Sequence, residues 1–416
     1  MLLIIPLLIG CAHKETNIPK NQLSFYKDIR PLLEQKCLRC HMGNGPGIGD
    51  FSDANTVVQL ADLMLNAIDD GRMPPPASDP SCNEYIGYES MTVSEEERTL
   101  LADWIDQGKE IGDAEAAPPI SLMEHTLESP DLQMLIPEPY TPQYTAENAK
   151  GNEYRCFVLE HEQEDPFYIT GMHPYVDQSA IVHHIVLAKA PRSSLSEEAF
   201  DPSGMNCISG AQELVTGNSS GSGMIAAWAP GGAPIRFDDG GILVQPNDVF
   251  ILQLHYYQAD PTISYSDRSG YLMETASTVE QTILMAPYGY HNFTIPAGDP
   301  SYSYSEEATV PTTFKIWASF PHMHLLGTGY DLSIIHQDGS EECVVRSDNY
   351  DFNNQLTYQF EDPIVVREGD SVFWECTWNN SSSNPYVYYD PPQDVGYGER
   401  TDEEMCYAFT LISLGE

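Results

Sequence analysis

The spacing of apolar residues divides the chain into a helical first part and a β-rich remainder. In the stretch 53–71 (DANTVVQLADLMLNAIDDG), apolar side chains recur at helical spacing until a glycine ends the pattern. The stretch 94–108 (SEEERTLLADWIDQG) begins with a capping box formed by Ser94 and Glu97, and its apolar residues form one face. These features predict a small all-α domain over residues 25–110.

From residue 128 onwards, short runs rich in β-branched and aromatic residues alternate with Gly, Pro, Asn and Asp. Such regular spacing indicates antiparallel β-sandwiches, and roughly 290 residues are too many for one ordinary sandwich. We therefore expect two all-β domains, at 128–278 and 279–416, after a linker at 111–127. The runs are FYITGM, AIVHHIVLA, DVFILQLHYYQ, TFKIWASF, YDLSIIHQ, QLTYQF and SVFWECTW.

Acidic residues greatly outnumber basic ones along the 416-residue chain. The 62 Asp and Glu against 19 Lys and Arg give a formal net charge of -43. Because binding of phosphates needs a basic surface, this composition excludes nucleic acid as a partner. The charge is typical of a surface that keeps a protein soluble.

The first eleven residues, MLLIIPLLIGC, form an apolar stretch that ends in a bacterial lipobox. They predict a lipoprotein signal at 1–11, a lipid on Cys11 and a polar tether at 12–24, with a plain signal peptide as the alternative. A run of about ten apolar residues is too short to span a bilayer, so we expect a lipid anchor only. We expect an exported protein on the periplasmic face of a bacterial membrane or at the cell surface, and Ala12 favours the outer membrane.

The sequence CLRCH at 37–41 has the C-x-x-C-H pattern of covalent haem attachment. Cys37 and Cys40 can bond the haem vinyl groups from one helical turn, and His41 then lies under the iron. The pattern can also arise by chance or bind zinc, but here it follows an export signal and lies in a helical segment of suitable size. Residues 22–110 resemble small class I-like bacterial cytochrome c domains, which implies one haem c.

The sixth haem ligand is predicted to be Met73, in the sequence GRMPPP at 71–76. Prolines fix the backbone around the thioether. A His/Met pair raises the reduction potential of the iron, which suits an electron carrier. Met42, Met64 and Met91 compete for this role, although Met64 lies among apolar residues in mid-helix and suits the core better.

Residues of metal-ligand type recur on or beside the predicted strands. Because residues i and i+2 of a strand point the same way, His322 and His324 can hold one ion together. The adjacent His183 and His184 can do so only from a strand end or a bulge, or through different ring nitrogens. Imidazole suits copper, zinc, iron and nickel, and an added thioether favours Cu(I). The full set is His183, His184, His255, His322, His324 and Met405.

This pattern resembles the copper type II ascorbate-dependent monooxygenases, a family that includes dopamine β-monooxygenase and the peptidylglycine hydroxylating enzyme. The resemblance covers about residues 128–416 and implies two jelly-roll-like domains. The matching strings occur in the family's order and are IVHHI at 181–185, WAPG at 228–231, LQLHY at 252–256, HMHL at 322–325 and DEEMC at 402–406.

The resemblance implies two copper ions with different roles. One copper receives and passes electrons, and its ligands are His183, His184 and His255. The other copper binds O₂ and abstracts a hydrogen atom from the substrate, and its ligands are His322, His324 and Met405.

Other positions follow the family or depart from it. The resemblance implies a disulfide between Cys376 and Cys406 and matches Gln253 to a residue near the first copper. Phe320 stands where the peptide-amidating branch has an Arg, so we do not expect a substrate bound through a carboxylate. The family's partner for Cys156 has no counterpart here. The pairing of four cysteines therefore stays open, and these are Cys82, Cys156, Cys207 and Cys343.

We therefore expect an enzyme that uses O₂ to hydroxylate an activated C–H bond of a small organic substrate. Electrons come from an external donor, an ascorbate-like reductant or a periplasmic redox protein. The fused haem supplies or relays them, since tethering raises the effective donor concentration. A non-catalytic electron-transfer or copper-binding lipoprotein is the alternative. A haem-fused cupredoxin enzyme needs a strand-borne Cys between His ligands, and Cys343, Cys376 and Cys406 have no such neighbours.

Overall fold

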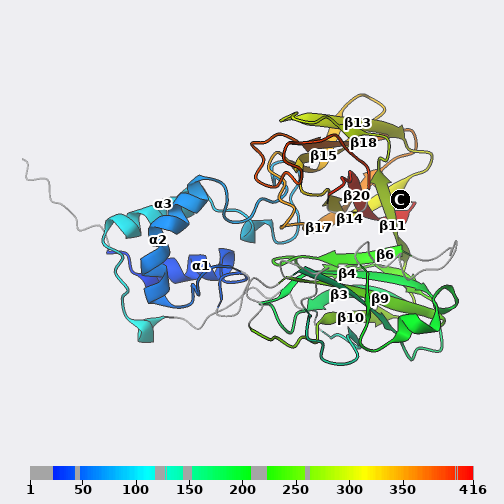
Figure 1. Ribbon diagram of the computed structural model, residues 1–416, viewed down its shortest axis with the longest axis horizontal. Helices are drawn as coiled ribbons and strands as arrows, with labels where there is room; N and C mark the ends of the chain where they lie inside the picture. The colour runs from blue at the N-terminus through cyan, green and yellow to red at the C-terminus, as the bar shows by residue number, and fades with distance from the viewer. Residues whose placement is uncertain are drawn as a thin grey trace, which may run out of the picture.

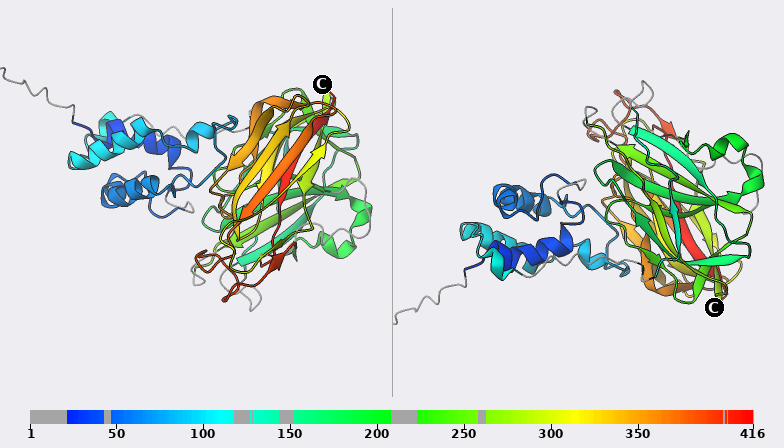
Figure 2. Two further views of the ribbon diagram at one scale, coloured as in Figure 1. Left: turned by 90° about the horizontal axis from the view of Figure 1, so that it is seen from above. Right: turned by 90° about the horizontal axis from the view of Figure 1, so that it is seen from below.

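The computed structural model has a small helical part beside two β-sandwiches (Figure 1). The helical part, drawn in blue and cyan, projects from one end of the β body in every view (Figure 2). Among the residues described, no helix is long and apolar enough to cross a membrane. The structure describes residues 22–42, 47–117, 127, 129–143, 152–207, 223–257, 263–398, 400 and 402–415.

Three α-helices form the N-terminal part, as the apolar spacing predicts. Asp53 caps the second helix by accepting a hydrogen bond from the backbone N–H of Thr56, and the predicted capping box of Ser94 and Glu97 is present. The apolar faces of the helices meet in a core around the fully buried Trp104. The helical elements are α1 (Arg30–Lys36), α2 (Ala54–Asp69) and α3 (Glu95–Asp106), with the single turns η1 (Phe25–Ile29), η2 (Tyr88–Ser90) and η3 (Ala114–Ala116).

The first sandwich contains ten strands and two short 3₁₀ turns. These are β1 (Leu132–Leu135), β2 (Asn152–Leu159), β3 (Phe167–Tyr175), β4 (Val182–Pro191), η4 (Arg192–Ser194), η5 (Glu197–Phe200), β5 (Met205–Asn206), β6 (Gly223–Trp228), β7 (Ile235–Arg236), β8 (Gly240–Val244), β9 (Asp248–Tyr257) and β10 (Gly270–Ala276). An antiparallel sheet in the order β5-β2-β9-β4-β6 packs against the sheet that contains β1, β10, β3 and β8.

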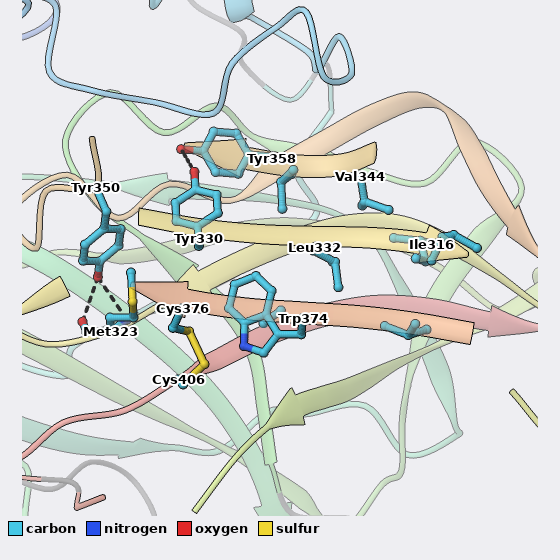
Figure 3. Packing of buried hydrophobic residues seen from close by; sticks show 14 of the residues in the cluster. Ile316, Met323, Tyr330, Leu332, Val344, Tyr350, Tyr358, Trp374, Cys376 and Cys406 are labelled. Carbon is cyan, nitrogen blue, oxygen red and sulfur yellow. Dashed lines mark hydrogen bonds between the residues drawn. A yellow bond between two sulfur atoms is a disulfide. The ribbon is translucent and has the colours of Figure 1, made fainter. Parts of the chain in front are cut away.

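The second sandwich contains the remaining strands. These are β11 (Gln281–Gly289), β12 (Thr294–Ile295), β13 (Tyr302–Thr309), β14 (Phe314–His322), β15 (Gly327–Ile335), β16 (Glu341–Ser347), β17 (Tyr358–Val366), β18 (Ser371–Trp378), β19 (Val395–Gly396) and β20 (Tyr407–Leu414). The sheet β13-β18-β15-β16 packs against β11, β20, β14 and β17. Trp374 and Leu332 are fully buried between them, and Tyr330 donates a hydrogen bond to the Tyr358 hydroxyl at 3.1 Å (Figure 3). The prediction of antiparallel β-sandwiches is confirmed.

One sheet continues through both sandwiches. β8 of the first sandwich pairs in parallel with β11 of the second, and Gly240 and Ile242 lie opposite Gln281 and Ile283. The strand order β1-β10-β3-β8-β11-β20-β14-β17, with β7 beside β3, therefore forms a single nine-stranded sheet. Backbone hydrogen bonds thus fix the two sandwiches relative to each other.

The segment between α2 and α3, residues 74–92, leaves the helical part and lies against the second sandwich. We call this segment the strap. Its side chains Tyr85 and Met91 are buried in the core of that sandwich, and a disulfide joins its Cys82 to Cys343 of β16. The sequence pattern predicts that these residues belong to the all-α domain at 25–110. In the structure the strap instead packs on the second sandwich, because its apolar side chains are buried in the core of that domain.

Candidate metal centres

Three histidines on neighbouring strands of the first sandwich form the first centre (His183, His184 and His255). β4 and β9 pair antiparallel, and their register sets His184 opposite His255. A β-bulge between Val182 and His184 interrupts the alternation of side chains, so His183 can face the same site as its neighbour. A bulge is one of the routes expected for adjacent histidines that share an ion.

The ring nitrogens of the first centre converge. The Nδ1 atom of His184 lies 3.4 Å from that of His183 and 3.3 Å from that of His255. One ligand atom from each residue lies within 4.8 Å of the others. Since a neutral imidazole has only one N–H, three converging nitrogens include lone pairs that a cation can satisfy. Burial lowers the pKa of His184 to about 3 and that of His255 well below its usual value, which keeps them in the metal-binding form.

Strand β2 supports the first centre from the other side of β9. The Tyr154 ring stacks on that of His255 with centroids 4.1 Å apart and planes 3° apart. Gln253 is buried and donates a hydrogen bond to the carbonyl oxygen of Cys207 at 2.8 Å, and Cys207 is disulfide-bonded to Cys156 of β2. These contacts hold β9, and with it His255, against β2.

The second centre (His322, His324 and Met405) lies where β14 ends and its partner β20 begins. The pairing of β14 and β20 ends at His322 and Tyr407. Beyond it, the backbone N–H groups of His324 and Met405 donate to the same carboxylate oxygen, which brings these two residues close together. Met323 is fully buried in the core, so the flanking histidines point the other way, with ring centroids 5.2 Å apart. The two histidines share one side as predicted, although His324 lies just beyond the strand.

Glu404 fixes the backbone around the second centre. Its buried carboxylate accepts hydrogen bonds through Oε2 from the backbone N–H of His324 at 2.9 Å and of Met405 at 3.2 Å. The Trp378 indole N–H donates to the same oxygen at 3.0 Å, and the Leu326 backbone N–H donates to Oε1 at 2.7 Å. One carboxylate therefore holds together the two segments that supply the ligands.

The histidines of the second centre have acceptors at Nδ1. Gln355 Oε1 lies 2.5 Å from Nδ1 of His322, and the Glu403 carbonyl oxygen lies 3.0 Å from Nδ1 of His324. Acceptors at these positions hold the proton on Nδ1 and leave Nε2 as the ligand atom. Burial lowers the pKa of both histidines, that of His322 to about 3, so both are neutral at physiological pH.

The first centre lies near residues of the second sandwich. The Asn353 side chain, from the second sandwich, lies near enough to His183 of the first to act on the pKa of that histidine. The charge of His322 also contributes to the lowered pKa of His184. Such a Coulombic effect requires proximity, because it weakens with separation. The fold therefore brings together ligand sets that are more than 60 residues apart in the sequence.

Aromatic side chains lie beside the second centre. The ring centroid of Phe320 is 6.0 Å from that of His322 and 6.1 Å from that of Phe409. Phe320 therefore lies close to His322, as its place in the sequence suggests, and it offers an apolar ring instead of a guanidinium.

The C-x-x-C-H residues form a turn directly after α1. The thiols of Cys37 and Cys40 are free and half-buried, and burial raises the pKa of both, that of Cys37 to about 12. Nδ1 of His41 lies 2.9 Å from the Ile48 carbonyl oxygen, which leaves Nε2 as a ligand atom, and the ring stacks on Phe51 at 4.1 Å. These residues fit a group that is attached through two thioethers and ligated by one imidazole.

The four candidate methionines lie in different surroundings. Met73 follows α2 and is 40% exposed, and its role as the sixth ligand stays a prediction. Met42 is also exposed. Met64 is buried in the helical core, as expected, whereas Met91 is buried in the core of the second sandwich.

Six of the described cysteines form three disulfides. One is the pair that the resemblance implies, and both of its residues are fully buried beside the second centre. The other two pairs answer the question that the sequence left open, since their partners are 261 and 51 residues apart and have no local spacing signal. The pairs are Cys82–Cys343, Cys156–Cys207 and Cys376–Cys406.

Sequence reasoning missed three residues that orient the ligands. Glu404 precedes Met405 in the string DEEMC, so its position was a usable signal. Asn353 and Gln355 lie about 30 residues after His322 in a polar segment, and nothing in their spacing links them to either centre.

Comparison with protein families gives two matches to one family. “Copper type II ascorbate-dependent monooxygenase, N-terminal domain” matches residues 140–262, and “Copper type II ascorbate-dependent monooxygenase, C-terminal domain” matches residues 284–412. Together the two matches cover more than half of the chain. They include all the residues of both centres.

Curated relatives agree with these matches. Dopamine beta-hydroxylase from Canis lupus familiaris is 24% identical over 273 residues, which are 61% of this chain and 41% of the relative. DBH-like monooxygenase protein 2 from Mus musculus is 27% identical over 248 residues, which are 55% of this chain and 37% of the relative. The chain thus spans about two fifths of the length of these relatives.

Among solved structures, the major capsid protein P2 from Bacteriophage PM2 aligns over 64% of this chain and 98% of that one, with 8% identity and a TM-score of 0.23. So weak a similarity carries no argument about fold or function. The family matches do, because they span both sandwiches and both ligand sets. The chain belongs to the copper type II ascorbate-dependent monooxygenase family.

Proposed function

We propose that the protein is a copper-dependent monooxygenase that hydroxylates an activated C–H bond of a small organic substrate with O₂. Two ligand sets support this most strongly, one with three converging imidazoles and one with two neighbouring imidazoles and Met405 close to them in the chain fold. In both sets burial keeps histidines neutral, and neighbouring groups orient several of the rings, as a metal ion requires.

The two ligand sets suit different roles. The first centre would hold one copper through nitrogen alone, and the second would hold another with a thioether that favours Cu(I). Copper, when bound, supplies one-electron redox chemistry and activation of O₂. The overall reaction uses one O₂, two electrons and two protons. One oxygen atom enters the C–H bond and the other leaves as water.

A haem c in the helical part would supply or relay the two electrons. Cys37 and Cys40 would attach it, and His41 and Met73 would be the axial ligands. Free thiols and an imidazole held at Nδ1 support this assignment. Covalent fusion raises the effective concentration of the donor at the copper domains. The electrons would come originally from an ascorbate-like reductant or a periplasmic redox protein.

The surroundings of the second centre favour a substrate without a carboxylate anchor. Phe320 beside His322 cannot form the paired hydrogen bonds that a guanidinium forms with a carboxylate. Cys11, the proposed lipid site, lies outside the described residues. Export and attachment to a membrane through that lipid, with the outer membrane favoured, remain part of this proposal.

Replacement of one ligand in the second centre tests the proposed function. His322→Ala protein should retain one copper and its haem spectrum but lose all O₂-dependent hydroxylation across a substrate panel. His336→Gln is a matched control, because this histidine of the same sandwich belongs to neither centre and should retain both copper ions and activity. Undiminished hydroxylation by His322→Ala protein would overturn the assignment.

A non-catalytic electron-transfer or copper-binding protein is the rival function. It predicts that the unmodified protein binds copper at both centres yet consumes no O₂ with any substrate of the panel in the presence of reductant. The His322, His324 and Met405 set favours the enzyme, because an added thioether favours Cu(I), the state that can meet O₂.

A further inference from the structure

We infer that the polar residues Asn353, Asn354 and Gln355 position the two centres against each other, with the strap as their anchor. This inference rests on the proposed function, since it assumes that copper occupies both centres. These are positioning residues, because they act on the ligands and not on substrate or oxygen. The N-terminal part of the chain would therefore hold the copper ligands in place, in addition to supplying electrons.

Three consecutive side chains lie beside three different parts of the molecule. Gln355 has a hydrogen bond with His322 of the second centre at 2.5 Å. Asn353 donates from Nδ2 to Asp351 Oδ1 at 3.1 Å, and its side chain lies near enough to His183 of the first centre to act on the pKa of that histidine. Between them, Asn354 donates from Nδ2 to the carbonyl oxygen of Pro76 in the strap at 2.7 Å. Residues 353–355 lie before β17 and outside any strand, so their side chains need not alternate between two faces as in a regular strand. Here a single short segment lies beside both centres and the strap.

The start of this segment is held by its own turn. Asp351 accepts hydrogen bonds from the backbone N–H of Asn353 through its side chain at 2.9 Å, and from that of Asn354 through its carbonyl oxygen at 2.9 Å. Asn354 is only 8% exposed, so its bond to the strap is shielded from water. A buried hydrogen bond of this kind is costly to break, because the separated groups cannot bond to solvent instead.

The continuation of the segment joins the first sandwich. Thr357 donates a hydrogen bond to the carbonyl oxygen of Ala227 in β6 at 3.1 Å. The Gln359 side chain accepts from the backbone N–H of Arg236 at 3.0 Å and donates to the carbonyl oxygen of the same residue. Residues 351–359 therefore contact both sandwiches and the second centre, and they lie near the first centre.

The strap holds the same segment from the side of the helical part. The backbone N–H of Ser78 donates to the Tyr358 hydroxyl at 2.9 Å, and that of Ile86 donates to the Gln359 carbonyl oxygen at 2.8 Å. The disulfide between Cys82 and Cys343 ties the strap covalently to β16. In Figure 1 the loop between α2 and α3 runs from the helices towards β17. The strap lies before residue 140, where the family match begins, so this anchor comes from the fused N-terminal part.

Asn354→Ala tests the inference in the full chain loaded with Cu(II), because it removes only the bond to Pro76. Amide hydrogens of residues 350–357 should exchange about five- to tenfold faster, as expected for the loss of one buried hydrogen bond. Copper stoichiometry should stay at two. The dipolar broadening between the two Cu(II) signals in the frozen-solution EPR spectrum should change, because the ligands of the second centre are held less rigidly relative to the first.

Two further variants keep the test decisive. Asn349→Ala, at an exposed asparagine five residues earlier, should leave exchange and broadening unchanged. The double variant Cys82→Ser/Cys343→Ser frees the strap without altering the segment and should reproduce both effects if Asn354→Ala protein does not fold. If either variant folds and binds two copper ions yet shows unchanged amide exchange and unchanged EPR broadening, that result would overturn this inference and leave the proposed function standing. Absence of copper from the unmodified protein would overturn the proposed function and this inference with it.

Discussion

Glu404 has no direct place among the ligands, yet its carboxylate accepts four hydrogen bonds around the second centre. Two of the donors are the backbone N–H groups of His324 and Met405, which lie 81 residues apart in the sequence. Because the group is fully buried, no water can replace it as an acceptor. At the residue scale, the geometry of the centre therefore depends on an acid that binds no metal itself.

Glu404→Ala should destabilise the second sandwich and empty the second centre. Each buried N–H left without an acceptor costs about 1–3 kcal/mol, so the free energy of unfolding should fall by about 3 kcal/mol or more. Denaturant unfolding of the metal-free protein and copper analysis of the loaded protein measure the two effects. Glu403→Ala is the control, since its backbone carbonyl still contacts His324. Equal stability and two copper ions in Glu404→Ala protein would contradict this account.

At the scale of elements, the sequence predicts those features that depend on residues close together in the chain. The capping box at Ser94, the short strands and the shared side of His322 and His324 all follow from periodicities of a few residues. The bulge that turns His183 was one of several routes left open, because bulges depend on the partner strand. The strap was misassigned, because which domain buries Tyr85 depends on tertiary packing and not on spacing.

The turn between β15 and β16 should make stability depend on pH. Nδ1 of His336 lies 3.1 Å from Asp370, and Nε2 lies 3.1 Å from Glu342. The hydrogen bond with Asp370 is the main cause that raises the pKa of His336. Since the folded state binds this proton more tightly, the stabilisation is complete below the unfolded pKa of about 6.5 and is lost as pH rises through the folded value.

His336→Gln checks this dependence. The unmodified protein should exceed the variant in free energy of unfolding at about pH 5.5, and this difference should shrink by about pH 8.5. Denaturant titrations of the metal-free proteins at both pH values measure it. A difference that stays constant or grows with pH would show that the histidine does not titrate as described.

At the scale of the whole molecule, a shared sheet joins the two sandwiches and the strap joins the helical part to the second. Cys82 and Cys343 are half-buried, whereas the cysteines of the other two disulfides are fully buried. Under mild thiol reduction, Cys82 and Cys343 should therefore be alkylated first, because exchange requires access to sulfur. Mass spectrometry of trapped thiols measures the order. Earlier labelling of Cys156 or Cys376 would contradict the burial described here.

Metal and haem content of the purified protein tests the central claim most directly, because each cofactor corresponds to one described set of residues. We expect two copper ions and one covalently bound haem per chain, with one copper lost when either centre is disrupted. A single copper, or a metal other than copper at the His183, His184 and His255 set, would contradict it.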